Sequence, residues 1–128
     1  MTDGKKLFAY FGSAVFVALD LEGKILWRKT LPGPFKAEWL CSSPLLFEDT
    51  LYIFCDVNNS TWLFALDART GKEIWRWYVV PKPGEPGSET WKDKTNAWKT
   101  GGGGLWQTGS YDPETKTTIW GTGNPVPI

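Results

Sequence analysis

The sequence contains no histidine, and it has only two cysteines and one methionine among its 128 residues. The lack of histidine removes the commonest general base and metal ligand of proteins. Two cysteines are too few for a disulfide framework, and Cys41 and Cys55 do not have the spacing of a zinc motif. If residues 43–56 form a hairpin, the two cysteines are diagonal neighbours on one face. A stretched disulfide between them is then one interpretation, and two unpaired thiols in the core are the other, which we favour.

Net charge and long apolar runs are also missing. Fourteen basic residues balance fourteen acidic ones and no basic run appears, so the electrostatic footprint of nucleic-acid binding is absent. No apolar stretch reaches the length of a membrane span or has the organisation of a signal peptide. No segment keeps an apolar period of about 3.6 residues over three turns, so the sequence predicts almost no helix.

Aromatic residues are abundant: they make up 16% of the chain and include nine tryptophans. Short aromatic and branched runs between turn residues predict an all-β fold. A loop over residues 80–106 is rich in Pro, Gly and charge, and loops of that length are often functional. The strands that we expect lie near residues 6–11, 15–19, 25–29, 43–47, 51–56, 62–66, 73–79, 107–112 and 117–122.

The sequence repeats itself. Residues 65–75 (ALDARTGKEIW) match residues 18–27 (ALDLEGKILW) with one more residue in the turn. Asp20 and Asp67 are 47 residues apart and Trp27 and Trp75 are 48 apart, which is the length of a four-stranded propeller blade. In each unit we expect the Asp to bond to backbone N–H groups of the turn, the Gly to make the turn and the Trp to dock flat between sheets. Such sheets must stack on neighbours to bury both faces.

The unit ALDARTGKEIW resembles the repeat of quinoprotein (PQQ-type) β-propellers. The resemblance implies antiparallel four-stranded blades: three strands of one blade over residues 6–29, a whole blade over 43–79 and the first two strands of a third over 107–122. Nine strands fall short of a closed ring. We therefore expect residues 1–128 to form an incomplete propeller of about two blades plus part of a third, with the remainder of a propeller or self-association as partner.

Residues 82–127 resemble PQQ-dependent alcohol dehydrogenases more closely, through the motifs GGGGLW, YDP and GTGNP and the gaps between them. The resemblance implies that Gly104 and Trp106 bind PQQ, with the indole as a flat floor under the quinone. It implies that Asn124 offers its amide oxygen to a calcium ion. Counting back eleven residues from Asp67 places Asp56 where the family has a calcium-binding Glu.

Each of these positions also has a plainer interpretation. Trp106 can be ordinary channel packing, and Asn124 can end a strand and begin a turn with Pro125. Asp56 has the shorter carboxylate, and the family motif around it is absent. The family's adjacent-cysteine disulfide, its catalytic Asp and its nearby Arg have no counterpart here. We find no base for the alcohol proton and no haem-attachment motif, so whether the chain is an enzyme stays open.

Two functions therefore compete. The first is a piece of a PQQ-dependent alcohol dehydrogenase-like propeller that carries part of the PQQ and calcium site and is inactive alone; the family implies a periplasmic location. The second is a non-catalytic propeller module that acts as a scaffold or interaction domain in the cell envelope. Carbohydrate binding through the loop tryptophans has no specific motif behind it. The spacing of Trp106 and Asn124 favours the first.

Overall fold

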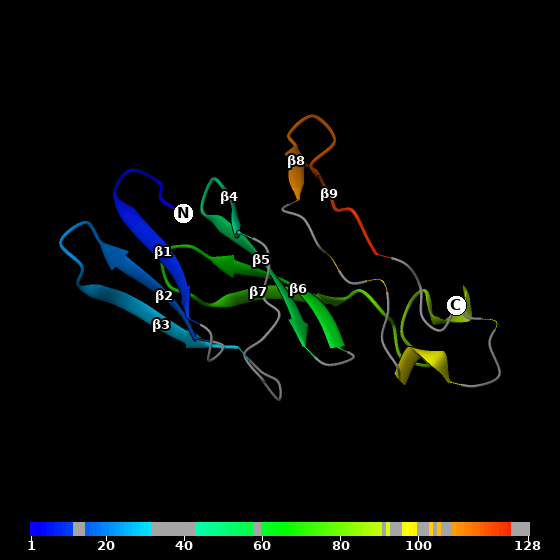
Figure 1. Cartoon of the computed structure of the whole chain (residues 1–128). Helices are drawn as coiled ribbons and strands as arrows, with labels where there is room; N and C mark the ends of the chain where they lie inside the picture. The colour runs from blue at the N-terminus through cyan, green and yellow to red at the C-terminus, as the bar shows by residue number, and fades with distance from the viewer. Residues whose placement is uncertain are drawn as a thin grey trace.

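The chain folds into two antiparallel sheets followed by a short hairpin (Figure 1). The computed structural model describes residues 1–11, 15–31, 43–57, 60–90, 92, 96–99, 103, 105 and 109–123, with the backbone only at positions 56, 57, 60 and 97. The helices in this part are two 3₁₀ turns in the long loop, η1 (Ser88–Thr90) and η2 (Ala97–Lys99). Neither is long and apolar enough to cross a membrane. The all-β prediction is confirmed.

Within the part of the chain that the structure describes, nine strands lie close to where the sequence predicts them. Sheet 1 has the order β1 (Lys6–Phe11), β2 (Val15–Asp20), β3 (Ile25–Thr30). Sheet 2 has the order β4 (Leu45–Phe47), β5 (Thr50–Val57), β6 (Ser60–Asp67), β7 (Glu73–Tyr78). The hairpin consists of β8 (Ser110–Asp112) and β9 (Thr117–Ile119). β9 ends three residues earlier than expected, because Thr122 pairs with Leu105 and leaves the hairpin.

The sequence repeat is also a repeat of backbone register. Trp27 on β3 lies opposite Ala18 on β2, and Trp75 on β7 lies opposite Ala65 on β6. In both sheets the register shifts at the next step, after the alanine. A bulge at the same place in both units aims the two tryptophans in the same way relative to their own sheets.

The turn of each repeat is held by its aspartate, as the sequence predicts. The Asp67 carboxylate accepts hydrogen bonds from the backbone N–H of Arg69 (2.9 Å) and Thr70 (2.8 Å) and from the Thr70 hydroxyl (3.0 Å). The Thr70 hydroxyl is the main cause of a lowered Asp67 pKa. Gly71 follows with a φ of 70°, a conformation that costs glycine no strain.

The core lies between the two sheets, where Trp27 docks on sheet 2. Its indole N–H donates a 3.0 Å hydrogen bond to the carbonyl of Ala68. Its ring covers Gly71, so that a Cβ at that position would lie 2.7 Å from a ring carbon. The predicted flat docking between sheets is thus confirmed for Trp27. The buried residues of this core are Phe8, Phe16, Ala18, Leu31, Leu51, Ile53, Cys55, Trp62, Phe64, Leu66 and Ala68.

Candidate functional site

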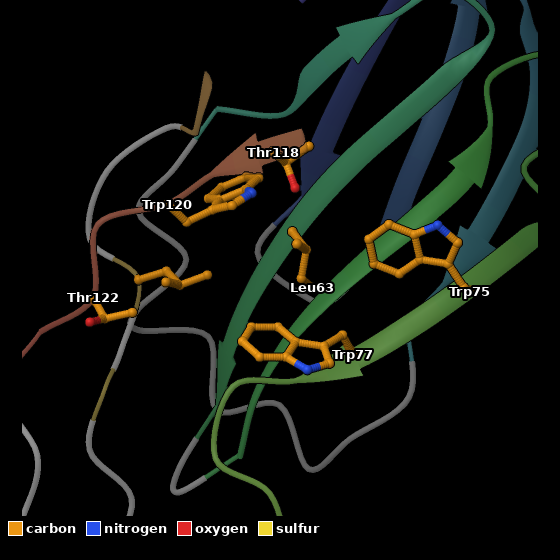
Figure 2. Close-up of a pocket in the computed structure, with 7 residues that line it drawn as sticks. Leu63, Trp75, Trp77, Thr118, Trp120 and Thr122 are labelled. Atoms are coloured by element: carbon orange, nitrogen blue, oxygen red, sulfur yellow. The ribbon is translucent and has the colours of Figure 1, made fainter. Parts of the chain in front are cut away.

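An apolar groove of about 490 Å³ separates the outer face of sheet 2 from the segment that follows β9. Figure 2 shows Trp75 and Trp77 projecting from β7 on one side, with Trp120 and Thr122 on the other. A volume of this size falls within the range of small-molecule sites, roughly 300–1,000 Å³. The residues that line the groove are Leu63, Trp75, Trp77, Leu105, Thr118, Trp120 and Thr122.

The wall on sheet 2 follows from the two-residue period of its strands. Trp77 lies opposite Leu63 and Trp75 opposite Ala65, so these four side chains share one face of the sheet. Phe64, between them in sequence, points the other way into the core. Trp75 and Trp77 keep 41% and 51% of their surface exposed. The groove therefore has a broad aromatic wall that meets solvent.

The opposite wall is built by Trp120 and its neighbours. The indole of Trp120 lies against Gly109, where any Cβ would overlap the ring. The indole N–H is buried and has no hydrogen-bond acceptor among the described residues. The hairpin that leads to it is held to sheet 2 by the rings of Phe47 and Tyr111, whose centroids are 3.8 Å apart. Trp120 thus brings a buried N–H without a described acceptor to a mainly apolar groove that the side chains of Thr118 and Thr122 also line.

The structure describes the neighbours of the predicted site residues rather than those residues themselves. Gly104, Trp106 and Asn124 lie outside the described residues, and Asp56 is placed on β5 opposite Thr61 by its backbone only. Leu105, between the two predicted cofactor-binding residues, forms an antiparallel bridge with Thr122. Thr122 stands two positions before the predicted metal ligand, and both bridge residues line the groove.

The carboxylates of the described part do not gather into a metal site. No three Asp, Glu, Cys or His side chains come together among the described residues. Asp112, which has turn spacing in the sequence, accepts hydrogen bonds from the Thr115 hydroxyl (2.6 Å) and the Glu114 backbone N–H (3.0 Å). The Thr115 hydroxyl is the main cause of its lowered pKa. Asp112 therefore holds its turn, as its spacing suggests.

Sequence reasoning did not select Trp77 or Trp120 as site residues. The signal for Trp77 is its place two residues after Trp75, which puts both on one strand face. The signal for Trp120 is its place just before the GTGNP motif. Trp75 was expected to dock between sheets, and this is wrong for the described part, where it lines the groove and stays 41% exposed.

Comparison with known proteins places this arrangement among propellers built of PQQ repeats. A family model of these repeats, described as outer membrane protein assembly factor BamB, matches residues 1–123. The 1-butanol dehydrogenase (quinone) of Thauera butanivorans is 31% identical over 97% of this chain. The chain spans about a quarter of that relative's length.

Solved structures agree with the sequence comparison. The quinohemoprotein alcohol dehydrogenase from Comamonas testosteroni is similar with a TM-score of 0.77 and 28% identity, over 95% of this chain and 20% of that one. A europium-containing methanol dehydrogenase is similar with a TM-score of 0.77 and 27% identity, over 94% of this chain and 24% of that one. The two sheets and the hairpin therefore have counterparts in a short part of these larger molecules.

Proposed function

Because this chain belongs to the PQQ-repeat β-propeller family, we propose that residues 101–124 form one wall of a PQQ and calcium site in an alcohol-oxidising quinoprotein. The observation that carries the proposal is the bridge between Leu105 and Thr122. It joins the stretch that contains Gly104 and Trp106 to the stretch that leads to Asn124. The proposal treats residues 1–128 as a partial propeller domain in which this wall borders the groove.

The groove suits a flat, polar-edged cofactor. Its tryptophans offer wide apolar faces, against which a fused-ring quinone can stack. The buried N–H of Trp120 needs an acceptor, and PQQ carries carbonyl and carboxylate oxygens at its edge. In this proposal the Trp106 indole is the floor under the ring system. Gly104 lets the backbone approach it, because glycine has no side chain in the way.

The metal assignment rests on the chemistry of the proposed ligands. Asn124 supplies a neutral amide oxygen and Asp56 a carboxylate, and calcium takes both kinds of oxygen. One structural relative is a europium-containing methanol dehydrogenase, and europium, like calcium, is a hard cation. Asp56 is the last but one residue of β5.

The chain's own contribution to the chemistry is binding and orientation. Bound PQQ supplies the electron acceptor for oxidation of an alcohol to an aldehyde. Residues 101–124 would hold the ring plane and exclude water from one of its faces. Removal of the alcohol proton needs a base, and we assign none to this chain. We therefore propose that it binds the cofactor without oxidising alcohols by itself, in the periplasmic setting that the family resemblance implies.

The test is a titration of the chain with PQQ, with and without calcium, read by tryptophan fluorescence and by calorimetry. We expect saturable, calcium-dependent binding that Trp106→Ala abolishes and that Asn124→Ala makes independent of calcium. Trp98→Ala is the matched control, because Trp98 lies in η2 and does not line the groove. We expect Asp56→Asn to weaken the calcium dependence as well, and Glu114→Gln is its control, because Glu114 is exposed in the β8–β9 turn and does not line the groove.

Circular dichroism establishes that each variant keeps its fold before the titrations are compared. A folded chain that takes up no PQQ at any calcium concentration sinks the cofactor proposal. That result would favour the scaffold function, which the BamB description of the matching family model suggests. If Trp106→Ala and Trp98→Ala lose binding equally, the fluorescence change does not report PQQ in the groove.

A further inference from the structure

Thr61 is buried on the face of sheet 2 that borders the groove. It is 6% exposed, and it is the only buried residue with a hydroxyl, amide or charged side chain in the part of the chain that the structure describes. It stands two positions before Leu63 on β6, so the two residues share one face of the sheet. Leu63 is also buried and lines the groove. Thr61 therefore brings a hydroxyl to the row of side chains on β6 that faces the groove.

The residue opposite Thr61 on β5 is Asp56, one of the proposed calcium ligands. Residues directly opposite each other in an antiparallel pair lie on the same face, with Cβ atoms about 4.5–5.5 Å apart. A threonine hydroxyl can reach a carboxylate across that distance and donate a hydrogen bond to it. The register of β5 and β6 thus pairs the buried hydroxyl with a residue that carries a carboxylate.

The glycine run that precedes the proposed quinone floor reaches the same end of sheet 2. Val79, which follows β7, donates its backbone N–H to the Thr61 carbonyl at 2.9 Å. Gly103 lies against Val79, since a Cβ at Gly103 would be 3.7 Å from a methyl group of that valine. Trp106 follows Gly103 three residues later in the sequence. Backbone contacts therefore join Thr61 to Asp56 on one side and to the neighbour of the glycine run on the other.

The two opposed residues have complementary needs. A carboxylate that ligates a cation is itself hydrogen-bonded in most metal sites, because the second partner fixes its orientation. A buried hydroxyl needs a hydrogen-bond partner as well, since burial without one costs free energy. A hydrogen bond from Thr61 to Asp56 meets both requirements at once.

We propose that Thr61 is a positioning residue for Asp56 in the calcium site. Its hydroxyl donates a hydrogen bond to one oxygen of the Asp56 carboxylate, which leaves the other oxygen for the cation. The inference rests on the proposed function, and it adds to that site a residue that acts through Asp56 and does not itself ligate the metal. Because the carboxylate is held before the cation arrives, it loses less freedom when calcium binds.

Three substitutions at this position separate the hydroxyl from the shape of the side chain. Thr61→Val removes the hydroxyl and keeps the branched shape, and Thr61→Ser keeps a hydroxyl and loses the methyl group. Thr61→Ala also lacks the hydroxyl and serves if the valine variant does not fold. Thr50→Val is the matched control, because Thr50 stands at the other end of the same strand pair, opposite the carboxylate residue Asp67. Thermal unfolding of each variant shows that it is folded.

Calorimetric titration with calcium in the presence of PQQ measures the effect. We expect Thr61→Val and Thr61→Ala to weaken calcium binding roughly tenfold, which is a usual cost of losing the partner of a metal ligand. Thr61→Ser and Thr50→Val should bind calcium like the wild type. The affinity for PQQ without calcium should be the same in all of these variants, because the hydroxyl acts only on the metal ligand.

The same titrations tell two failures apart. A folded wild type that binds neither PQQ nor calcium overturns the proposed function, and the role of Thr61 with it. If the wild type binds both and the two variants without the hydroxyl bind calcium equally well, the proposed function stands and the role of Thr61 is wrong, even where stability is lost. Equal weakening in Thr61→Ser or in Thr50→Val also overturns that role, because the effect then does not come from a hydroxyl at this position.

Discussion

Trp27 and Gly71 are so close that no side chain larger than hydrogen fits between the indole and the turn of the next sheet. The glycine at this position therefore serves two ends. It gives the turn its positive φ, and it lets an indole lie flat on the backbone. Gly23 shares only the first of these constraints within one chain, since no atom lies near its missing Cβ.

Alanine substitutions at Gly23 and Gly71 can separate the free-energy cost of backbone strain in the turn from the cost of a collision with the indole. We expect Gly23→Ala to cost roughly 1–2 kcal/mol of unfolding free energy, the penalty of a left-handed conformation. Gly71→Ala should cost a further 1–3 kcal/mol or so, because the methyl group collides with Trp27. Urea unfolding at low protein concentration measures both. Equal losses in the two variants would mean that the indole moves aside without cost.

The hydrogen bonds of Asp67 in its turn should make the free energy of unfolding depend on pH in the acidic range. The pKa of Asp67 is lowered chiefly by the Thr70 hydroxyl, so the folded state favours the ionised carboxylate. That contribution is present above the unfolded pKa, about 3.8, and is lost as pH falls through the lower folded value. We expect wild type to be more stable than Asp67→Asn near neutral pH and the gap to shrink as pH falls below about 4. A gap that stays constant across this pH range would contradict the assignment.

Cys55 should be inert while the chain is folded. Burial raises the pKa of its thiol from 9.0 to about 12, so the reactive thiolate is scarce. At mildly alkaline pH we expect iodoacetamide to leave Cys55 unmodified in the folded chain and to alkylate it in urea, as peptide mass mapping can show. Rising pH above 9.0 should also lower stability, because the unfolded thiol ionises first. Rapid labelling of Cys55 in the folded chain would refute its burial.

The guanidinium of Arg76 should be hard to replace with a simple cation. It donates two hydrogen bonds to the Glu73 carboxylate (3.0 and 2.8 Å) and lies 4.8 Å from the centre of the Phe64 ring. Arg76→Lys keeps the charge but loses the fork, so we expect a loss of about 1–2 kcal/mol in chemical unfolding.

Arg28→Lys is the matched control, because Arg28 is the repeat counterpart of Arg76 and is exposed. It should change stability by less than about 0.5 kcal/mol. A loss in Arg28→Lys as large as that in Arg76→Lys would show that the effect comes from lysine in a strand and owes nothing to the fork.

The repeat turns were predictable because their chemistry is local. Asp67, Thr70 and Gly71 lie within five residues of one another, and their hydrogen bonds need no distant partner. The turn between β4 and β5 lies where the predicted hairpin over residues 43–56 puts it, but its conformation could not be predicted. Glu48 there has a φ of 49°, and no glycine marks it. The backbone N–H of Ala68 donates to the Asp49 carbonyl at 2.7 Å. This bond joins the β6–β7 turn to the β4–β5 turn, and sequence alone does not show the pairing.

The candidate site was predictable in part only. The repeat treats Trp27 and Trp75 alike, and the difference between them depends on whether a second sheet lies opposite. The groove joins Trp77 to Trp120, residues far apart in the sequence. Their meeting depends on how the β8–β9 hairpin packs, and the tilted contact between the rings of Phe47 and Tyr111 helps to hold that hairpin. No sequence period encodes such a contact.

The bulge shared by the two sheets has a consequence for how this chain can change over time. Since the register shifts at the same step in both sheets, the two sheets are copies of one structural repeat with equivalent packing surfaces. A whole repeat can be duplicated or deleted, because the repeats on either side then pack against the same kind of surface as before. Gains and losses of complete units of about 47 residues are therefore tolerated far better than an insertion of one residue between the alanine and the tryptophan.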